Sequence, residues 1–138
     1  MANRRFKQFR QALEAVVTEL FLEVTFGATG APTLVTSITL PDGQTVNPSK
    51  GIASVVRTGT GAYTITLQDN YVRMLMLNHR FIDASAPASP GLYVVADNSS
   101  AISSPNIQVV LNAAGTATDP ASGEQMLVQI VLSNSTAP

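Results

Sequence analysis

The spacing of hydrophobic residues changes once along this chain, near residue 20. In residues 1–19 apolar side chains recur every three to four positions, at Phe6, Phe9, Leu13 and Val16 or Val17, and neither Gly nor Pro interrupts them. This spacing predicts an amphipathic helix, which Asn3 could cap. From residue 20 onward apolar and polar residues alternate instead, as they do in strands with one buried face.

The alternating region contains seven or eight short strand candidates separated by Gly, Pro, Asn and Asp. Almost no helical pattern follows residue 19, so we expect an antiparallel β-sandwich or barrel with an N-terminal helical or extended arm. The expected hairpins are 52–68, which turns at Thr58–Ala62, and a final pair formed by 107–112 and 126–133. The strand candidates are 20–26, 33–40, 52–58, 63–68, 71–83, 92–97, 107–112 and 126–133. Residues 71–83 could instead form a short helix, but a strand is favoured.

Two of these strands carry more apolar residues than one small core needs. VRMLML (72–77) and LVQIVL (127–132) have apolar residues on both faces. In an antiparallel sheet the second face normally meets water. Such faces require cover from the N-terminal helix, a second sheet or another subunit, and we expect a homo-oligomer.

The pattern predicts two parts, a basic amphipathic arm (1–19) and a β domain (20–138). The basic start is followed by charges where a secretory signal would be apolar, so no signal peptide is expected. No uncharged apolar run reaches the 18 residues of a membrane-spanning helix.

The composition limits the catalytic and binding sites that this chain can form. Charged residues make up 12% of the 138 residues, against about 25% in a typical soluble domain. The chain has no Cys, which excludes disulfides, thiolate metal sites and cysteine nucleophiles. The net charge of −1 does not favour a nucleic-acid partner. We expect no catalytic residue, no metal site and no cofactor.

The few candidates for chemistry have simpler structural explanations. His79 is the only imidazole and no nucleophile-elbow motif accompanies it. Gly59 and Gly61 precede a strand and lack the third glycine of a dinucleotide site. Four aspartates lie in turn signals, where their side chains can accept bonds from nearby backbone N–H groups. They are Asp42, Asp69, Asp97 and Asp119. Residues 119–124 could hold Ca²⁺ but lack the alternating oxygen ligands of an EF-hand.

The arm holds half of the basic residues. Four of the eight lie in the first ten positions, and the remainder of the chain is acidic. Three interpretations are open: a helix packed on its own domain, an arm that binds a neighbouring chain or an acidic surface, and a frayed tail. The candidate partner-binding residues are Arg4, Arg5, Phe6, Lys7, Phe9, Arg10 and Leu13.

Three stretches resemble small virion structural proteins of tailed bacteriophages. They are GIASVVRTGTGAYTITLQDNY (51–71), the Thr118–Glu124 turn with MLVQIVLSNS (126–135), and the basic opening Arg4–Arg10. Together they cover about half of the chain and contain no catalytic motif.

Within that group the resemblance implies a β-rich capsid decoration, or cement, protein. Such proteins assemble as trimers on the outer surface of the head, and a terminal arm reaches across neighbouring coat subunits. The resemblance therefore implies the major capsid protein and further copies of this chain as partners, neither nucleic acid nor membrane, and a location on the virion after synthesis in the host cytoplasm. The alternative is a fibre, spike or adaptor component of the head or tail. A small hydrolase or binding module of other origin would need His79 beside a serine hydroxyl and a carboxylate in a pocket.

Overall fold

The computed structural model describes residues 17–82 and 90–134, which are almost entirely β-structure. Seven strands of six to ten residues form the body, in line with the predicted number. They are β1 (Val17–Phe26), β5 (Ile52–Gly59), β6 (Ala62–Leu67), β7 (Arg73–Ile82), β8 (Gly91–Asn98), β9 (Asn106–Ala113) and β11 (Gln125–Ser133). The shorter elements are η1 (Ala28–Gly30), β2 (Pro32–Leu34), β3 (Ile38–Thr39), β4 (Thr45–Val46) and β10 (Thr116–Ala117).

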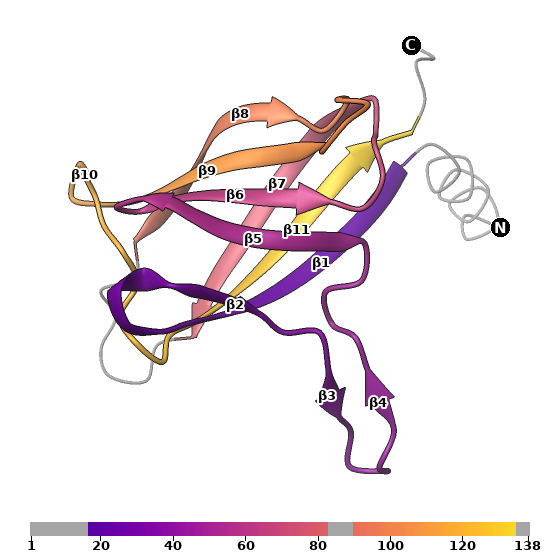
Figure 1. The fold of residues 1–138 in the computed structure, drawn as a ribbon, viewed down its shortest axis with the longest axis horizontal. Coiled ribbons are helices and arrows are strands. Elements are labelled where there is room, and N and C mark those ends of the chain that lie inside the picture. The colour runs from indigo at the N-terminus through magenta and orange to yellow at the C-terminus, as the bar shows by residue number, and fades with distance from the viewer. Residues whose placement is uncertain (1–16, 83–89, 135–138) are drawn as a thin grey trace, which may run out of the picture.

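The body consists of two antiparallel sheets packed face to face (Figure 1). The first has the order β2-β1-β11-β7. The second has the order β10-β9-β6-β5, and β8 also pairs with β9. Their strands cross at a wide angle in the view of Figure 1. The predicted antiparallel sandwich is confirmed.

The core lies between the inner faces of these sheets and follows the alternation of the sequence. On β1, the predicted set Leu20, Leu22, Val24 and Phe26 is buried. The inward residues of β11 oppose the second sheet in the same way, because side chains two positions apart share one face of a strand. The other buried apolar residues are Ile52, Val55, Tyr63, Ile65, Leu67, Ile107, Val109, Leu111, Met126, Val128, Ile130 and Leu132.

Three local expectations differ from the structure. Residues 17–19 open β1, so this strand begins three residues before the predicted boundary, whereas residues 1–16 lie outside the described residues. The predicted strand 33–40 is divided into β2 and β3, because the chain leaves β1 after the bond from Val35 N to Glu23 O. Residues 41–51, predicted as a loop, contain β4, which pairs with β3.

The predicted final hairpin is wrong. β11 pairs with β1 and β7, whereas β9 pairs with β6, β8 and β10 in the other sheet. Both strands bury one face in the core, so they face each other across the sandwich instead of lying side by side. The connection between them is long enough to cross from one sheet to the other. By contrast, the predicted 52–68 hairpin is confirmed as β5 and β6.

Residues 73–82 form a strand, as favoured, but β7 is not buried on both faces. It is the last strand of its sheet, and Leu75, Met76 and Ile82 are exposed. β11 is central, yet Leu127 on its outer face is also partly exposed. The apolar surplus of these strands therefore lies on the surface of the described structure.

Candidate interaction surfaces

The predicted site residues Arg4, Arg5, Phe6, Lys7, Phe9, Arg10 and Leu13 all lie outside the described residues. The structure does show where the body receives the arm. Val17 begins β1 and is paired with Ser133 at the end of β11, and Asn134 donates a side-chain hydrogen bond to Thr18 Oγ1. Both ends of the body therefore lie at one corner of the first sheet.

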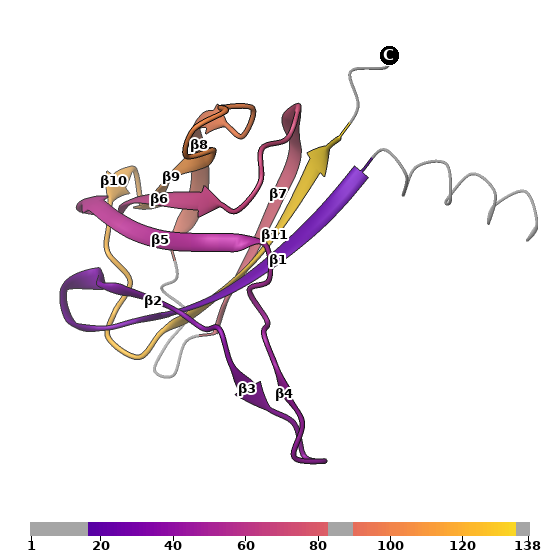
Figure 2. The ribbon, with the colours of Figure 1, turned by 45° about the vertical axis from the view of Figure 1, so that its right-hand side comes forward.

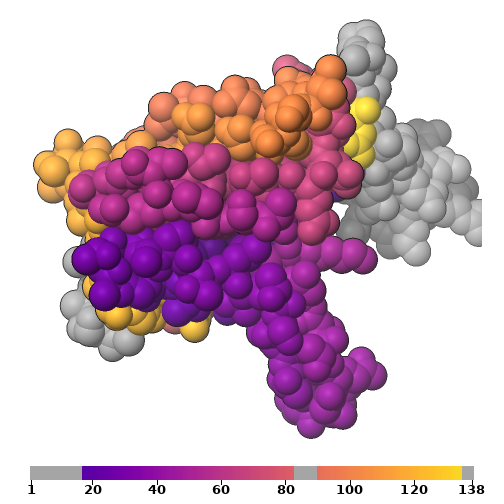
Figure 3. All heavy atoms as spheres, in the orientation of Figure 1, coloured from indigo at the N-terminus to yellow at the C-terminus, as the bar shows by residue number. Residues whose placement is uncertain are grey.

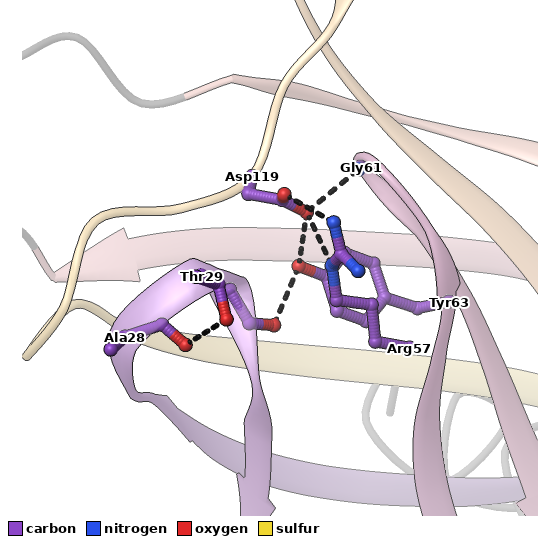
Figure 4. A network of polar contacts seen from close by, with 7 residues as sticks. Ala28, Thr29, Arg57, Gly61, Tyr63 and Asp119 are labelled. Carbon is purple, nitrogen blue, oxygen red and sulfur yellow. Dashed lines mark hydrogen bonds and ion pairs between the residues drawn. The ribbon is translucent and has the colours of Figure 1, made fainter.

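A cluster of polar contacts joins Arg57 to Asp119 (Figure 4). Arg57 Nε donates to Asp119 Oδ1 at 3.0 Å, and Nη2 donates to Oδ2 at 2.7 Å. This two-pronged geometry fixes both planar groups. The bonds from Arg57 hold the pKa of the Asp119 carboxyl at about 2, below the usual 3.8. Asp119 is therefore charged across the physiological pH range.

The same carboxylate also holds the β5–β6 turn and meets a buried tyrosine. Gly61 N donates to Asp119 Oδ1 at 2.8 Å. The Tyr63 hydroxyl donates to Gly30 O at 2.9 Å and lies 3.1 Å from Asp119 Oδ1. Burial, followed by the charge of Asp119, raises the pKa of Tyr63, so its hydroxyl stays protonated and can donate. We call Arg57, Gly61, Tyr63, Gly30 and Asp119 the polar latch.

The polar latch requires glycine at two positions. Gly30 has φ +68°, and a Cβ there would lie 2.7 Å from the Tyr63 hydroxyl. Gly61 has φ +65°, and a Cβ there would lie 2.6 Å from Leu111 O. Left-handed backbone and lack of space both favour glycine. These contacts tie together η1, the β5–β6 turn and the β10–β11 connection, which is a structural role.

The polar latch joins segments that are far apart in the sequence. Arg57, Gly61 and Tyr63 belong to 51–71, and Asp119 belongs to 118–124. Sequence reasoning placed Asp119 in a local turn, but its partners are 56 to 62 positions away. The polar latch therefore depends on long-range contacts.

The remaining turn aspartates include two with the expected backbone contacts. Asp42 accepts a bond from Gln44 N, and Asp97 accepts bonds from Ser99 N and Met74 N. Burial opposes ionisation of Asp97, but the bonds from Ser99 and Met74 outweigh it and lower its pKa. Within 119–124, Glu124 accepts from Ala121 N. The described residues contain no group of three His, Asp or Glu side chains suited to a metal ion.

His79 lies exposed on the edge strand β7. Its ring meets Phe81 edge-on, with centroids 5.8 Å apart, and partial burial lowers its pKa. Among the described residues, no serine hydroxyl or carboxylate is hydrogen-bonded to His79. The arrangement that would support a hydrolase is therefore not formed by the described part of the chain.

The outer face of the first sheet carries a shallow groove of about 550 Å³. Cross-strand pairing places Phe21, Gln129 and Asn78 in one row and Glu23, Leu127 and Arg80 in the next. Phe21 is more than half exposed. Glu23 and Arg80 carry opposite charges and lie on either side of Leu127. A groove with apolar residues between charged ones is suited to binding the surface of another protein.

A hairpin formed by β3 and β4 projects from the body (Figures 2 and 3). Pro48, which follows β4, is one of the residues that line the groove. The exposed apolar residues of the hairpin are Leu40 and Val46. Its base is fixed to β1, because the buried Ser49 Oγ accepts a bond from Glu23 N at 3.0 Å. An isolated two-stranded hairpin is marginally stable in water, so a contact with another molecule would stabilise it.

Large apolar side chains are also exposed on the edge strands β7 and β8, which belong to different sheets. Six of their large apolar side chains are exposed: Leu75, Met76, Ile82, Tyr93, Val94 and Val95. Of the three tyrosines, Tyr63 is buried, Tyr71 packs partly against the core and Tyr93 is exposed on β8.

No described helix is long and apolar enough to cross a membrane. A scan against models of protein families, a search of curated proteins and a search of solved structures each found no match to this chain.

Proposed function

We propose that this chain is a virion structural protein that decorates the outer surface of a phage head and stabilises it as a homotrimer. Its partners are the major capsid protein and further copies of itself, and its role is binding without catalysis. The proposal starts from the sequence resemblance to small phage virion proteins. Four residues of the polar latch belong to two of the stretches that carry this resemblance: Arg57, Gly61, Tyr63 and Asp119.

One observation carries the proposal: many large hydrophobic side chains of the described body are exposed. Twelve large hydrophobic side chains are exposed, against sixteen in the buried core. Scattered apolar residues are normal on a surface, but contiguous patches mark sites of protein contact. Here they gather on the edge strands, the groove and the projecting hairpin. A protein that acts by covering junctions between coat subunits needs such surfaces.

In this proposal residues 1–16 attach the body to the coat. Arg4, Arg5, Lys7 and Arg10 supply positive charge for an acidic surface, and Phe6, Phe9 and Leu13 supply an apolar stripe. Each contact is weak alone. In a trimer, once one chain has bound the coat, the other two chains bind it intramolecularly. This raises the avidity by about 10²–10⁴.

The first test is the number of copies of this chain per major capsid protein in purified particles, measured by quantitative mass spectrometry. A ratio approaching one supports a layer that covers the head. A handful of copies per particle contradicts it and favours the fibre, spike or adaptor alternative.

The second test removes residues 1–14, which leaves every described contact of the body in place. We expect the truncated chain to keep its unfolding midpoint but to lose binding to particles stripped of the native protein. The matched variant is the full chain with Arg4, Arg5, Lys7 and Arg10 changed to Gln, which keeps the apolar stripe. It should bind more weakly than the wild type at low salt, and the difference should disappear at high salt, where the charges of the wild type are screened. A truncated chain that unfolds, or that still binds fully, contradicts the assignment of the arm.

A further inference from the structure

The outer face of the second sheet is formed by β5, β6, β9 and β8, and its cross-strand rows contain no charged residue. The alternate residues Tyr63, Ile65 and Ile107 are buried in the core, so these rows point away from it. The first row is Ser54, Thr66, Asn106 and Asn98, the second is Val56, Thr64, Gln108 and Ala96, and the third is Ala62, Val110 and Tyr93. We call these residues the neutral face.

The outer face of the first sheet points the opposite way and has a different chemistry. It carries Glu19, Glu23 and Arg80. Charged groups on a surface attract charged partners and raise the rate at which they associate. The neutral face offers no such attraction, so its chemistry does not favour a nucleic acid, an anionic polysaccharide or a charged protein surface.

Hydroxyl and amide groups make up most of the first two rows. Such groups both donate and accept hydrogen bonds. Gln108 lies between Thr64 and Ala96 in the second row and is exposed, and no described residue is hydrogen-bonded to its side chain. Asn98 Nδ2 donates to Asn106 Oδ1 at 3.2 Å, and Asn106 Nδ2 donates to Ser104 O at 2.8 Å. These bonds orient both amides in advance, which lowers the entropic cost of binding a ligand.

The third row presents an aromatic ring at the β8 side of the face. Tyr93 is 60% exposed and lies opposite Val110 of β9. A Cβ at Gly91 would lie 3.4 Å from Tyr93 Cε2 and 3.5 Å from its hydroxyl oxygen. The ring therefore leans along the strand over Gly91, where a lack of side chain leaves room for it. A ring in this position offers an apolar surface beside the rows of hydroxyl and amide groups.

We propose that the neutral face binds a neutral polysaccharide chain. A sugar ring combines an apolar C–H face, which packs on an aromatic ring, with hydroxyl groups that rotate to donate or to accept. Neighbouring strands lie about 4.8 Å apart, which is close to the length of one pyranose ring. Successive sugars of a chain laid across the strands would thus meet successive side chains of a row.

The flatness of the face favours a polymer over a single sugar. Each row crosses three or four strands, so a single ring would contact only a small part of it. A protein partner fits less well, because its fixed donors and acceptors would leave some of the buried hydroxyl and amide groups unmatched, which is costly. This binding goes beyond the proposed function and does not depend on it. The two outer faces point in opposite directions, so a ligand on one does not displace a partner from the other.

The test measures binding of the full chain to soluble polysaccharides by affinity electrophoresis. The neutral probes are dextran, galactomannan, xyloglucan and hydroxyethyl cellulose, and each is compared with its carboxymethylated derivative. Tyr93→Ala and Gln108→Glu alter the neutral face. Their controls are Met76→Ala, which removes a 49% exposed side chain from the outer face of the first sheet, and Gln125→Glu on the same outer face. Urea unfolding checks that every variant folds, and Tyr93→Leu replaces Tyr93→Ala if the latter does not.

We expect the wild type to bind at least one neutral polysaccharide and to bind its carboxymethylated derivative at least about tenfold more weakly, with the free monosaccharide competing only weakly. Tyr93→Ala and Gln108→Glu should each lower the affinity about tenfold, whereas the two controls should bind as the wild type does.

The inference would be overturned if none of the neutral polysaccharides binds, if the carboxymethylated polymers bind equally well, or if the controls lose as much affinity as the variants of the neutral face. It would also be overturned if Gln108→Glu lowers the mass of the ligand-free protein in light scattering, because the neutral face would then be a contact between copies of this chain. None of these results bears on the copy number that tests the proposed function.

Discussion

Replacing Asp119 by Asn tests the polar latch with little change of shape. The amide keeps an oxygen for Gly61 N but removes the charge that binds Arg57. In the folded protein the pKa of Asp119 is about 2 instead of 3.8, which corresponds to about 2.5 kcal/mol at 1.36 kcal/mol per pKa unit. The side chains of Arg57 and Asp119 remain 32% and 20% exposed, so solvent screening reduces this to about 1.5 kcal/mol.

Urea unfolding at pH 7 should show this loss, and thermal unfolding should show a midpoint lower by about 5 °C. The control is Asp42→Asn on the projecting hairpin, where the carboxylate accepts only Gln44 N. We expect this control to change stability by less than about 0.5 kcal/mol.

The pH dependence gives an independent check. Because the pKa of Asp119 is lower in the folded state than in the unfolded state, the charged carboxylate stabilises the fold above pH about 4. This stabilisation is lost as the pH falls toward 2. The difference in stability between wild type and Asp119→Asn should therefore be constant from pH 5 to 7 and shrink below pH 4. A difference that is absent at pH 7, or that does not shrink in acid, would refute the role assigned to the polar latch.

Two further substitutions examine the backbone and the imidazole. Gly61→Ala should lower the free energy of unfolding by about 3 kcal/mol or more, because its Cβ would lie 2.6 Å from a carbonyl oxygen. The control is Gly115→Ala, which has φ +84° and open space and should lower it by about 1 kcal/mol. Equal losses in urea unfolding would contradict the close contact at Gly61. His79→Ala should change stability by less than about 0.5 kcal/mol and leave binding to particles unchanged, because its ring is exposed and contacts only the edge of Phe81 among described rings. A marked loss in either assay would identify a partner for this imidazole.

Local pattern predicted the parts of this fold that depend on one strand at a time. The alternation in 20–26 identified all four buried residues of β1, and the Gly-rich turn identified the β5–β6 hairpin. The pairing of strands was harder to predict. Alternation of apolar and polar residues shows which face of a strand is buried, but it does not show which strand lies next to it. For that reason β9 and β11 were predicted to form a hairpin although they belong to different sheets.

The contacts within the candidate sites could not be predicted from local sequence pattern either. The bond between Arg57 and Asp119 joins positions 62 residues apart, and no local spacing signals it. The apolar surplus in 72–77 was visible in the sequence, but a strand buried on both faces and an exposed edge strand have the same composition. The arm remains a prediction, since its candidate residues lie outside the described part of the chain.

The pairing of Val17 with Ser133 affects how the body can be held. Paired residues on antiparallel strands lie about 5 Å apart, so the segments continuing from both ends leave through nearly one point. An attachment through the arm would therefore hold the body at one corner. A second contact far from this corner would set the orientation of the body, and the projecting β3–β4 hairpin offers a place for such a contact (Figure 2).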